Sequence, residues 1–155
     1  MKSLIYLILL TFFTTSCGFN VVYPTKQNNF DIAEITTSGD SLIAYKIKNK
    51  LLFNSKKNEK RLVYIDLNVS KIKNIKEKNI KNEITKYEII IKANVNIKEI
   101  AKKDDLNFTI SNTGDYNVVD QYAKTLNNEK RLVELLTDNL SDQILDEITI
   151  KINAL

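Results

Sequence analysis

The residue with the clearest chemical role in this sequence is Cys17, which is the only cysteine in the chain. It follows the small polar residues Thr14–Ser16 and an apolar run from Leu4 to Phe13, and Lys2 places a positive charge before that run. A positive start, a short apolar run and small residues before a cut site are typical of a secretory signal. A bilayer span needs about 20 apolar residues, so this shorter run predicts a cleaved signal rather than a transmembrane helix.

A cysteine directly after the small residues favours a bacterial lipoprotein signal over the alternative, an ordinary secretion signal with an incidental cysteine. We predict cleavage between Ser16 and Cys17, after which the thiol and the new amino group of Cys17 would carry acyl chains. Thr14 departs from the usual lipoprotein pattern, in which an aliphatic residue is commoner at that position. Gly18 rather than aspartate follows the cysteine, and in the general lipoprotein sorting pattern this predicts localisation to the periplasmic side of the outer membrane.

The remaining residue types exclude most catalytic and metal-binding chemistry. The chain has no histidine, which excludes zinc sites built from histidine and cysteine and nucleophile systems that depend on histidine. Carboxylates alone could form an acid–base pair, but such a pair needs a cleft that separates two pKa values, and solvated surface acids are far commoner. The candidate acids are Asp40, Asp66, Glu83, Glu88, Asp104, Asp105 and Asp115. We therefore predict that the protein is not an enzyme, binds no metal, and has no cofactor besides the covalent lipid on Cys17.

The basic charge of the chain is weak evidence for a nucleic-acid partner. The sequence has a pI near 9.0 and a net charge of +4, but only two of its basic residues are arginines and its lysines are interleaved with acids. Nucleic-acid binding also needs a clustered patch or a recognisable motif, and none is evident. We predict no nucleic-acid partner.

Residue patterns divide the chain into a signal at 1–16, an acylated N-terminus and linker at 17–29, and a single domain at 30–155. A short strand is expected at Phe30–Ile35. Ile43, Ile47 and Leu51 then recur every fourth residue, which predicts an amphipathic helix from about Asp40 to Phe53, with Asp40 near its N-cap.

Apolar and polar residues alternate in three later segments, which is typical of strands with one buried face. The apolar sets are Val63, Ile65, Leu67 and Val69; Tyr87, Ile89, Ile91, Ala93, Val95 and Ile97; and Leu106, Phe108 and Ile110. Lys73–Asn82 and Asn112–Asp115 are expected to be loops. The one-sided pattern favours an antiparallel sheet over a parallel sheet buried on both faces.

A second, longer helix is expected from about Asp120 to Ile148. Its apolar stripe consists of Leu132, Leu136, Leu140, Ile144 and Ile148. Together these elements predict an α+β fold in which two helices pack on one face of a four-stranded, mainly antiparallel sheet.

The order of these features resembles the lipopolysaccharide-assembly lipoprotein family, LptE, over nearly the whole mature chain. The local matches are Cys17–Phe19, Thr36–Asp40 before the first helix, Thr85–Ile97, and Tyr122–Lys124 at the start of the second helix. Each match is weak by itself, and their order and spacing carry the resemblance. The extended polar tail of some relatives is missing.

The resemblance implies a non-catalytic outer-membrane lipoprotein that plugs a large lipopolysaccharide-assembly β-barrel (LptD-like) and supports insertion of lipopolysaccharide into the outer leaflet. By the same resemblance, Lys81 and Lys124 match basic positions that the family uses for lipopolysaccharide. The expected topology also brings Lys76 and Lys78 to the same edge of the sheet, where they would add to the positive field. Solvated loop lysines are the alternative in so lysine-rich a chain. The alternative function is a general envelope lipoprotein that binds another protein or a glycan through its open sheet.

Overall fold

The computed structural model describes residues 30–54, 61–99 and 105–154. In chain order the elements are β1 (Asp31–Gly39), α2 (Ser41–Asn54), β2 (Leu62–Lys78), β3 (Ile84–Glu99), β4 (Leu106–Asn117) and α3 (Tyr122–Asn153). The predicted signal and linker, including Cys17, lie outside the described residues.

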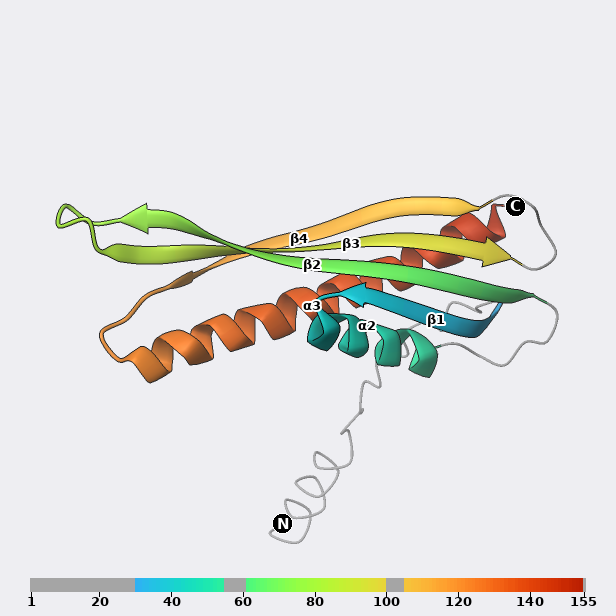
Figure 1. Ribbon diagram of the computed structural model, residues 1–155, viewed down its shortest axis with the longest axis horizontal. Helices are drawn as coiled ribbons and strands as arrows, with labels where there is room; N and C mark the ends of the chain where they lie inside the picture. The colour runs from blue at the N-terminus through green and yellow to red at the C-terminus, as the bar shows by residue number, and fades with distance from the viewer. Residues whose placement is uncertain (1–29, 55–60, 100–104, 155) are drawn as a thin grey trace, which may run out of the picture.

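The four strands form one sheet in the order β1-β2-β3-β4, with both helices on one face (Figure 1). β1 and β2 are parallel, as the intervening helix α2 requires, whereas β2–β3 and β3–β4 are antiparallel. Helix α2 packs mainly on β1 and β2, and α3 packs on β4 and β3. The predicted fold class, two helices on one face of a four-stranded and mainly antiparallel sheet, is confirmed.

The core lies between the sheet and the helices. It is formed largely by the apolar residues that the alternating sequence pattern predicts to face inward. The apolar sets predicted for β2 and β3 are buried, apart from the half-buried Tyr87, and so are Leu136, Leu140, Ile144 and Ile148 in the α3 stripe. The predicted inward residues of β4, Leu106, Phe108 and Ile110, are only partly buried, as is Leu132. β4 is an edge strand, so solvent reaches these side chains from one side.

The turn between β1 and α2 depends on Gly39 and Asp40. Gly39 has a φ of +86°, and its backbone lies so close to β2 that a Cβ atom there would be 2.0 Å from the carbonyl oxygen of Val69. This approach lets the Asp40 N–H donate to that same carbonyl at 2.8 Å. The Asp40 side chain then accepts a hydrogen bond from the Ile43 N–H at 3.1 Å, which confirms its predicted role as N-cap.

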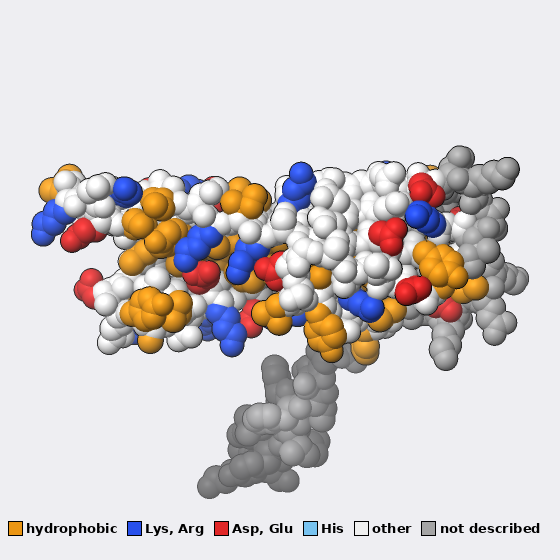
Figure 2. Space-filling model, in the orientation of Figure 1, with side chains coloured by type: hydrophobic (Ala, Val, Ile, Leu, Met, Phe, Trp, Pro, Cys, Tyr) orange, Lys and Arg blue, Asp and Glu red, His pale blue; other side chains and the backbone are white. Residues whose placement is uncertain are grey.

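In the described part of the chain, the opposite face of the sheet carries no helix. Figures 1 and 2 view the right-hand half of the sheet from this side, where the strands lie in front of α3 and the surface is mostly neutral and polar. Thr36, Asn68, Asn94 and Thr109, one from each strand, belong to this surface. The one-sided burial is the arrangement that the alternating sequence predicts.

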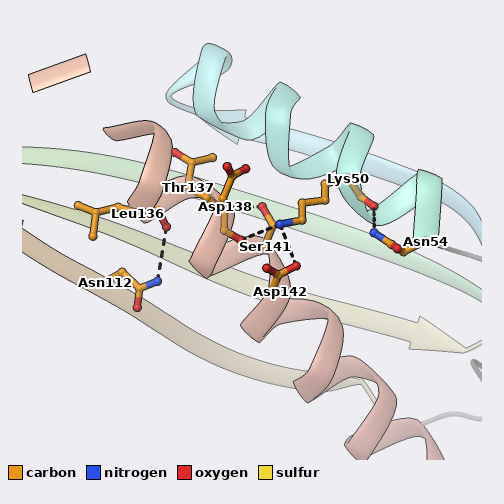
Figure 3. A network of polar contacts seen from close by, with 8 residues as sticks. All are labelled: Lys50, Asn54, Asn112, Leu136, Thr137, Asp138, Ser141 and Asp142. Atoms are coloured by element: carbon orange, nitrogen blue, oxygen red, sulfur yellow. Dashed lines mark hydrogen bonds and ion pairs between the residues drawn. The ribbon is translucent and has the colours of Figure 1, made fainter. Parts of the chain in front are cut away.

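Polar contacts join the two helices to each other (Figure 3). The Lys50 ammonium on α2 donates to the Asp138 carbonyl oxygen at 3.0 Å and forms an ion pair with the Asp142 carboxylate at 2.8 Å. The buried Ser141 hydroxyl donates to the Thr137 carbonyl oxygen of the preceding turn at 2.7 Å. Hydroxyls that bond within their own helix can therefore be buried at this contact without an unsatisfied donor.

Two segments predicted as loops are strands instead. Most of Lys73–Asn82 belongs to β2, where Lys73 pairs with Ile89 of β3, and Asn112–Asp115 lies within β4. Cross-strand hydrogen bonding outweighs the low strand propensity of lysine, asparagine and glycine in these segments. Gly114 lies close to α3, because a Cβ atom there would be 2.7 Å from the end of the Leu132 side chain.

Candidate functional site

The β2–β3 hairpin extends beyond the helices at one end of the molecule. Alternate residues of β2 are buried up to Val69, but every residue from Ser70 to Lys78 is exposed. Figure 1 shows the tip of this hairpin projecting past the start of α3. The side chains of this segment are therefore available to a ligand or partner.

The hairpin ends in a turn organised by Asn79. The Asn79 side-chain oxygen accepts hydrogen bonds from the backbone N–H groups of Lys81 and Glu83, each at 2.9 Å, and its amide nitrogen donates to the Glu83 carboxylate at 2.7 Å. Asn82 takes a positive φ of 65°, a conformation that asparagine tolerates better than most residues. These contacts fix the backbone that presents Lys81.

Several lysines of the hairpin are already neutralised by carboxylates. The Lys76 ammonium lies 2.5 Å from Asp115 and 3.8 Å from Glu88, and the Lys86 ammonium lies 2.6 Å from Glu77. The hydrogen bond to Asp115 and the charges of neighbouring acids raise the pKa of Lys76 above its usual value. The expectation that Lys76 adds to a positive field is therefore wrong, because Glu88 on β3 and Asp115 on β4 balance its charge.

Lys73 and Glu129 join the hairpin to α3. The Lys73 ammonium lies 2.6 Å from the Glu129 carboxylate and 4.3 Å from the ring centre of Tyr87. Tyr116 stacks on Tyr87 and donates its hydroxyl to Glu129 at 2.7 Å. Burial works against both charges, but the hydrogen bonds outweigh it: they lower the pKa of Glu129 and raise that of Lys73. This cluster positions the start of α3 against the hairpin.

The structure places the predicted residues Lys81 and Lys124 on separate elements at the same end of the molecule. Lys81 lies in the turn after β2 and Lys124 in the first turn of α3, and both are exposed. Among the described residues, neither ammonium forms an ion pair or a side-chain hydrogen bond. Lys78 donates to the neutral Asn82 side chain at 3.0 Å and so keeps its charge uncompensated. Fewer lysines are therefore available to an anionic ligand than expected. They are Lys78 and Lys81 near the hairpin turn and Lys124 at the start of α3.

Exposed apolar side chains accompany these lysines, and they were not predicted from the sequence to be part of a site. They are Ile75 and Ile80 on the hairpin, Val119 before α3, and Tyr122 and Leu126 on its first turns. Figure 2 shows hydrophobic and lysine side chains mixed over the left end of the molecule, where the hairpin and the start of α3 lie. The isoleucines within the lysine-rich segment Lys73–Asn82 could have indicated this apolar surface, but that segment was predicted to be a loop. We call these apolar residues together with Lys78, Lys81 and Lys124 the hairpin-end surface.

The combination of free ammonium groups and exposed aliphatic side chains defines the chemistry that this surface offers. Ammonium groups bind phosphate as point charges, and aliphatic side chains bind hydrocarbon. A ligand that carries phosphate and acyl groups close together therefore matches the surface better than a purely ionic or purely apolar ligand.

Five of the acids considered for catalysis have structural partners instead, whereas Asp105 is exposed. Asp40 caps α2, Asp66 lies 3.7 Å from Lys98, and Glu83 bonds the hairpin turn, whereas Asp104 lies outside the described residues. Glu88 and Asp115 share Lys76. In the part of the chain that the structure describes, no group of three or more acids or cysteines could hold a metal ion, and no helix is long and apolar enough to cross a membrane. The absence of enzymatic activity stays a prediction.

Comparison with known proteins identifies the fold. No protein-family model matches the chain, and no curated protein shows significant sequence similarity to it. Among solved structures, rare lipoprotein B from Shewanella oneidensis is similar at 14% identity with a TM-score of 0.59, over 78% of this chain and 98% of that one. A putative lipoprotein from Caulobacter crescentus is similar at 9% identity and a TM-score of 0.55, over 84% and 97% of the two chains.

An uncharacterised lipoprotein B from Nitrosomonas europaea has the same arrangement, at 12% identity and a TM-score of 0.52, over 83% of this chain and 90% of that one. These likenesses cover nearly all of each neighbour, so they concern the whole domain rather than a shared fragment. The chain has the fold of a group of bacterial lipoproteins.

Proposed function

We propose that this protein is a non-catalytic lipoprotein of the outer membrane, anchored through Cys17, that fills the lumen of a large lipopolysaccharide-assembly β-barrel. In this role it binds lipopolysaccharide through the hairpin-end surface during insertion into the outer leaflet. The fold shared with bacterial lipoproteins and the lipoprotein signal expected at Cys17 support the membrane anchor. Large outer-membrane barrels have a polar lumen that another domain can fill, and the helix-free polar face of the sheet suits that environment.

The observation that carries the proposal is the hairpin-end surface. Lys81 and Lys124 retain free charges beside Ile80 and Tyr122, whose exposed fractions are 103% and 75%. Lipid A offers phosphate and acyl chains within one molecule, and this surface offers the complementary groups. A site for a soluble anion would not need exposed aliphatic side chains, and a site for hydrocarbon alone would not need free lysines.

Exchange of both lysines for aspartate should weaken lipopolysaccharide binding by roughly tenfold or more, because each cation near an anionic lipid surface contributes about 1 kcal/mol. The remaining binding should also depend less on salt, since fewer charges take part. Binding of purified lipopolysaccharide is measured at several salt concentrations for the unmodified protein and for the double variant that carries Lys81→Asp and Lys124→Asp. Co-purification with the barrel is measured in parallel and should be retained, because loss of a rim charge affects a broad interface little.

The matched control carries Lys46→Asp and Lys151→Asp, which change the net charge equally but lie on the helices and pair with Glu134 and Glu147. This control should bind lipopolysaccharide nearly as well as the unmodified protein. Equal loss of binding in both variants would show that net charge matters and the location does not. Unchanged binding in the test variant would reduce Lys81 and Lys124 to ordinary surface lysines.

Replacement of Cys17 by alanine should abolish lipid attachment, because it removes the only thiol that can be acylated. The measurement is incorporation of radiolabelled palmitate, followed by separation of the inner and outer membranes. The unmodified protein should carry label and fractionate with the outer membrane, whereas the variant should carry none. Continued labelling of the variant would exclude Cys17 as the anchor, and recovery of the unmodified protein mainly in the inner membrane would contradict the predicted sorting.

A further inference from the structure

Helix α2 exposes large apolar side chains on the side that faces away from the sheet. Leu42, Tyr45 and Phe53 are 66%, 63% and 89% exposed, and Leu52 beside Phe53 is 38% exposed. Their spacing places them on one side of the helix, which we call the outer stripe of α2. The opposite side supplies the buried residues Ile43, Ala44, Ile47 and Leu51. Figure 2 shows hydrophobic side chains along the lower edge of the molecule, where α2 lies. An exposed apolar stripe on a helix marks a surface that binds a protein or a membrane.

The charges within α2 are all positive, because the helix contains three lysines and no acid. Lys46 pairs with Glu134 of α3 at 3.6 Å. Lys50 likewise pairs with Asp142 of α3 at 2.8 Å, so the boundary between the two helices is nearly neutral. Lys48 donates to a backbone carbonyl instead and keeps its charge. Apolar side chains beside lysines, without acids, are typical of a helix that lies on a membrane surface.

The outer stripe extends toward the end of the domain where the chain enters it. Helix α2 begins directly after β1 and runs back along that strand, where Lys48 donates to the Ile35 carbonyl oxygen at 2.8 Å. The last turn of α2, which contains Phe53, therefore lies toward the start of β1 (Figure 1). The most exposed residue of the stripe is thus near the point from which the chain leads back to Cys17.

The predicted anchor holds this part of the domain close to a bilayer. Residues 17–29 separate the predicted acylated Cys17 from Phe30, and a fully extended chain of that length spans at most about 45 Å. Phe30 is fully buried, so the tether starts from a fixed point of the domain. Tethering makes the second contact intramolecular, and a few apolar side chains can then hold the helix on a membrane that they could not bind alone.

We infer that the anchored protein, when it is not bound to its barrel, lies on the periplasmic leaflet of the outer membrane through the outer stripe of α2. This inference rests on the proposed anchor at Cys17. Phe53 and Tyr45 would insert at the level of the lipid headgroups, a depth that aromatic side chains favour, and Lys48 would bind a lipid phosphate as a point charge. Asp138 is exposed on α3 and would be repelled by lipid phosphates, which limits the contact to α2. The helix-free face of the sheet then points away from the membrane.

The experiment uses the acylated, full-length mature protein in vesicles of phosphatidylethanolamine and phosphatidylglycerol, without lipopolysaccharide or a barrel. The chain has no tryptophan, so Phe53→Trp introduces a single fluorescent reporter into the outer stripe. Tyr64→Trp is the matched control. Tyr64 pairs with Glu34 near the start of β1, but it alternates with the buried residues of β2 and so lies on the helix-free face. Lipids brominated on their acyl chains should quench the Phe53→Trp reporter severalfold more strongly than the Tyr64→Trp reporter.

Further substitutions show whether the rest of the stripe holds the reporter in the membrane. Leu42→Ser with Tyr45→Ser, added to Phe53→Trp, should reduce the quenching by about threefold or more, because most of the apolar area of the stripe is lost. The control pair, Tyr64→Ser with Ile72→Ser, removes two exposed apolar side chains from the helix-free face and should leave the quenching unchanged. Thermal melts check that all variants fold.

Flotation of the protein with the vesicles is measured first and separates the two proposals. A protein that does not float would contradict the anchor at Cys17, and with it both the proposed function and this inference. If the protein floats but brominated lipid quenches both reporters equally, or quenches neither, this inference alone is overturned. It is also overturned if the Phe53→Trp reporter is shielded from aqueous acrylamide without being quenched by brominated lipid, because a second copy of the chain would then cover the stripe.

Discussion

Replacement of Ile91 or Leu136 by alanine should lower the free energy of unfolding by about 2–5 kcal/mol, the range for truncating a buried large aliphatic side chain. Ile91 is fully buried in the middle of β3, and Leu136 lies on the α3 face that packs on the sheet. Each truncation removes apolar contacts and leaves a cavity between the sheet and the helices. Urea unfolding monitored by circular dichroism measures the loss.

Glu134→Ala serves as the control for these truncations. Glu134 lies on α3 two residues before Leu136, but its side chain is 44% exposed and its ion pair with Lys46 is long, at 3.6 Å. Exposed pairs of this kind contribute little, so the change should be below about 0.5 kcal/mol. If the three variants unfold at the same urea concentration, the packing face of α3 and the register of β3 described above are wrong.

Gly39→Ala should lower the free energy of unfolding by about 3 kcal/mol or more, through a different mechanism. The left-handed backbone at Gly39 is unfavourable for any residue with a Cβ atom, by about 1–2 kcal/mol. In addition, that atom would lie 2.0 Å from the Val69 carbonyl oxygen, which is rigid backbone. Relief of the clash requires movement of β1 away from β2 and loss of the hydrogen bond from Asp40 to Val69.

Ser38→Ala is the matched control, because it changes the neighbouring exposed residue without altering backbone freedom. It removes one exposed hydrogen bond, from Asn68, and should change the stability by less than about 1 kcal/mol. Thermal melts compare the two variants. Equal melting temperatures for Gly39→Ala, Ser38→Ala and the unmodified protein would contradict the close approach of β1 to β2.

Much of the fold was predictable because buried apolar residues recur at regular spacing along each strand and helix. Alternation in β3 and the four-residue spacing in α3 predicted the core residues, and Asp40 predicted the start of α2. The two segments wrongly predicted as loops share one property: they lack the alternating buried apolar residues by which strands are predicted from sequence. Beyond Val69 the β2 strand continues without burial because it pairs with β3, and β4 continues through Gly114 because Gly114 pairs with Ile89 of β3.

The candidate site was less predictable, since its properties depend on cross-strand neighbours. Sequence alone could place Lys76 at the hairpin end, but not show that Asp115, 39 residues later, neutralises it. Sequence alone also could not show that Lys73 forms an ion pair with Glu129 of α3. The asparagines of the helix-free sheet face are evenly spaced polar residues in the sequence, and only strand register brings Asn96 beside Asp66 and Asn107.

Affinity purification of the mature protein from detergent-solubilised outer membranes tests the central claim most directly. Proteins that remain bound are identified by mass spectrometry, and their ratio to the lipoprotein is measured. We predict recovery of one large lipopolysaccharide-assembly β-barrel in a one-to-one complex, both with the unmodified protein and with the variant that carries Lys81→Asp and Lys124→Asp. Recovery of the unmodified protein without any β-barrel would contradict the account and leave a general envelope lipoprotein in its place.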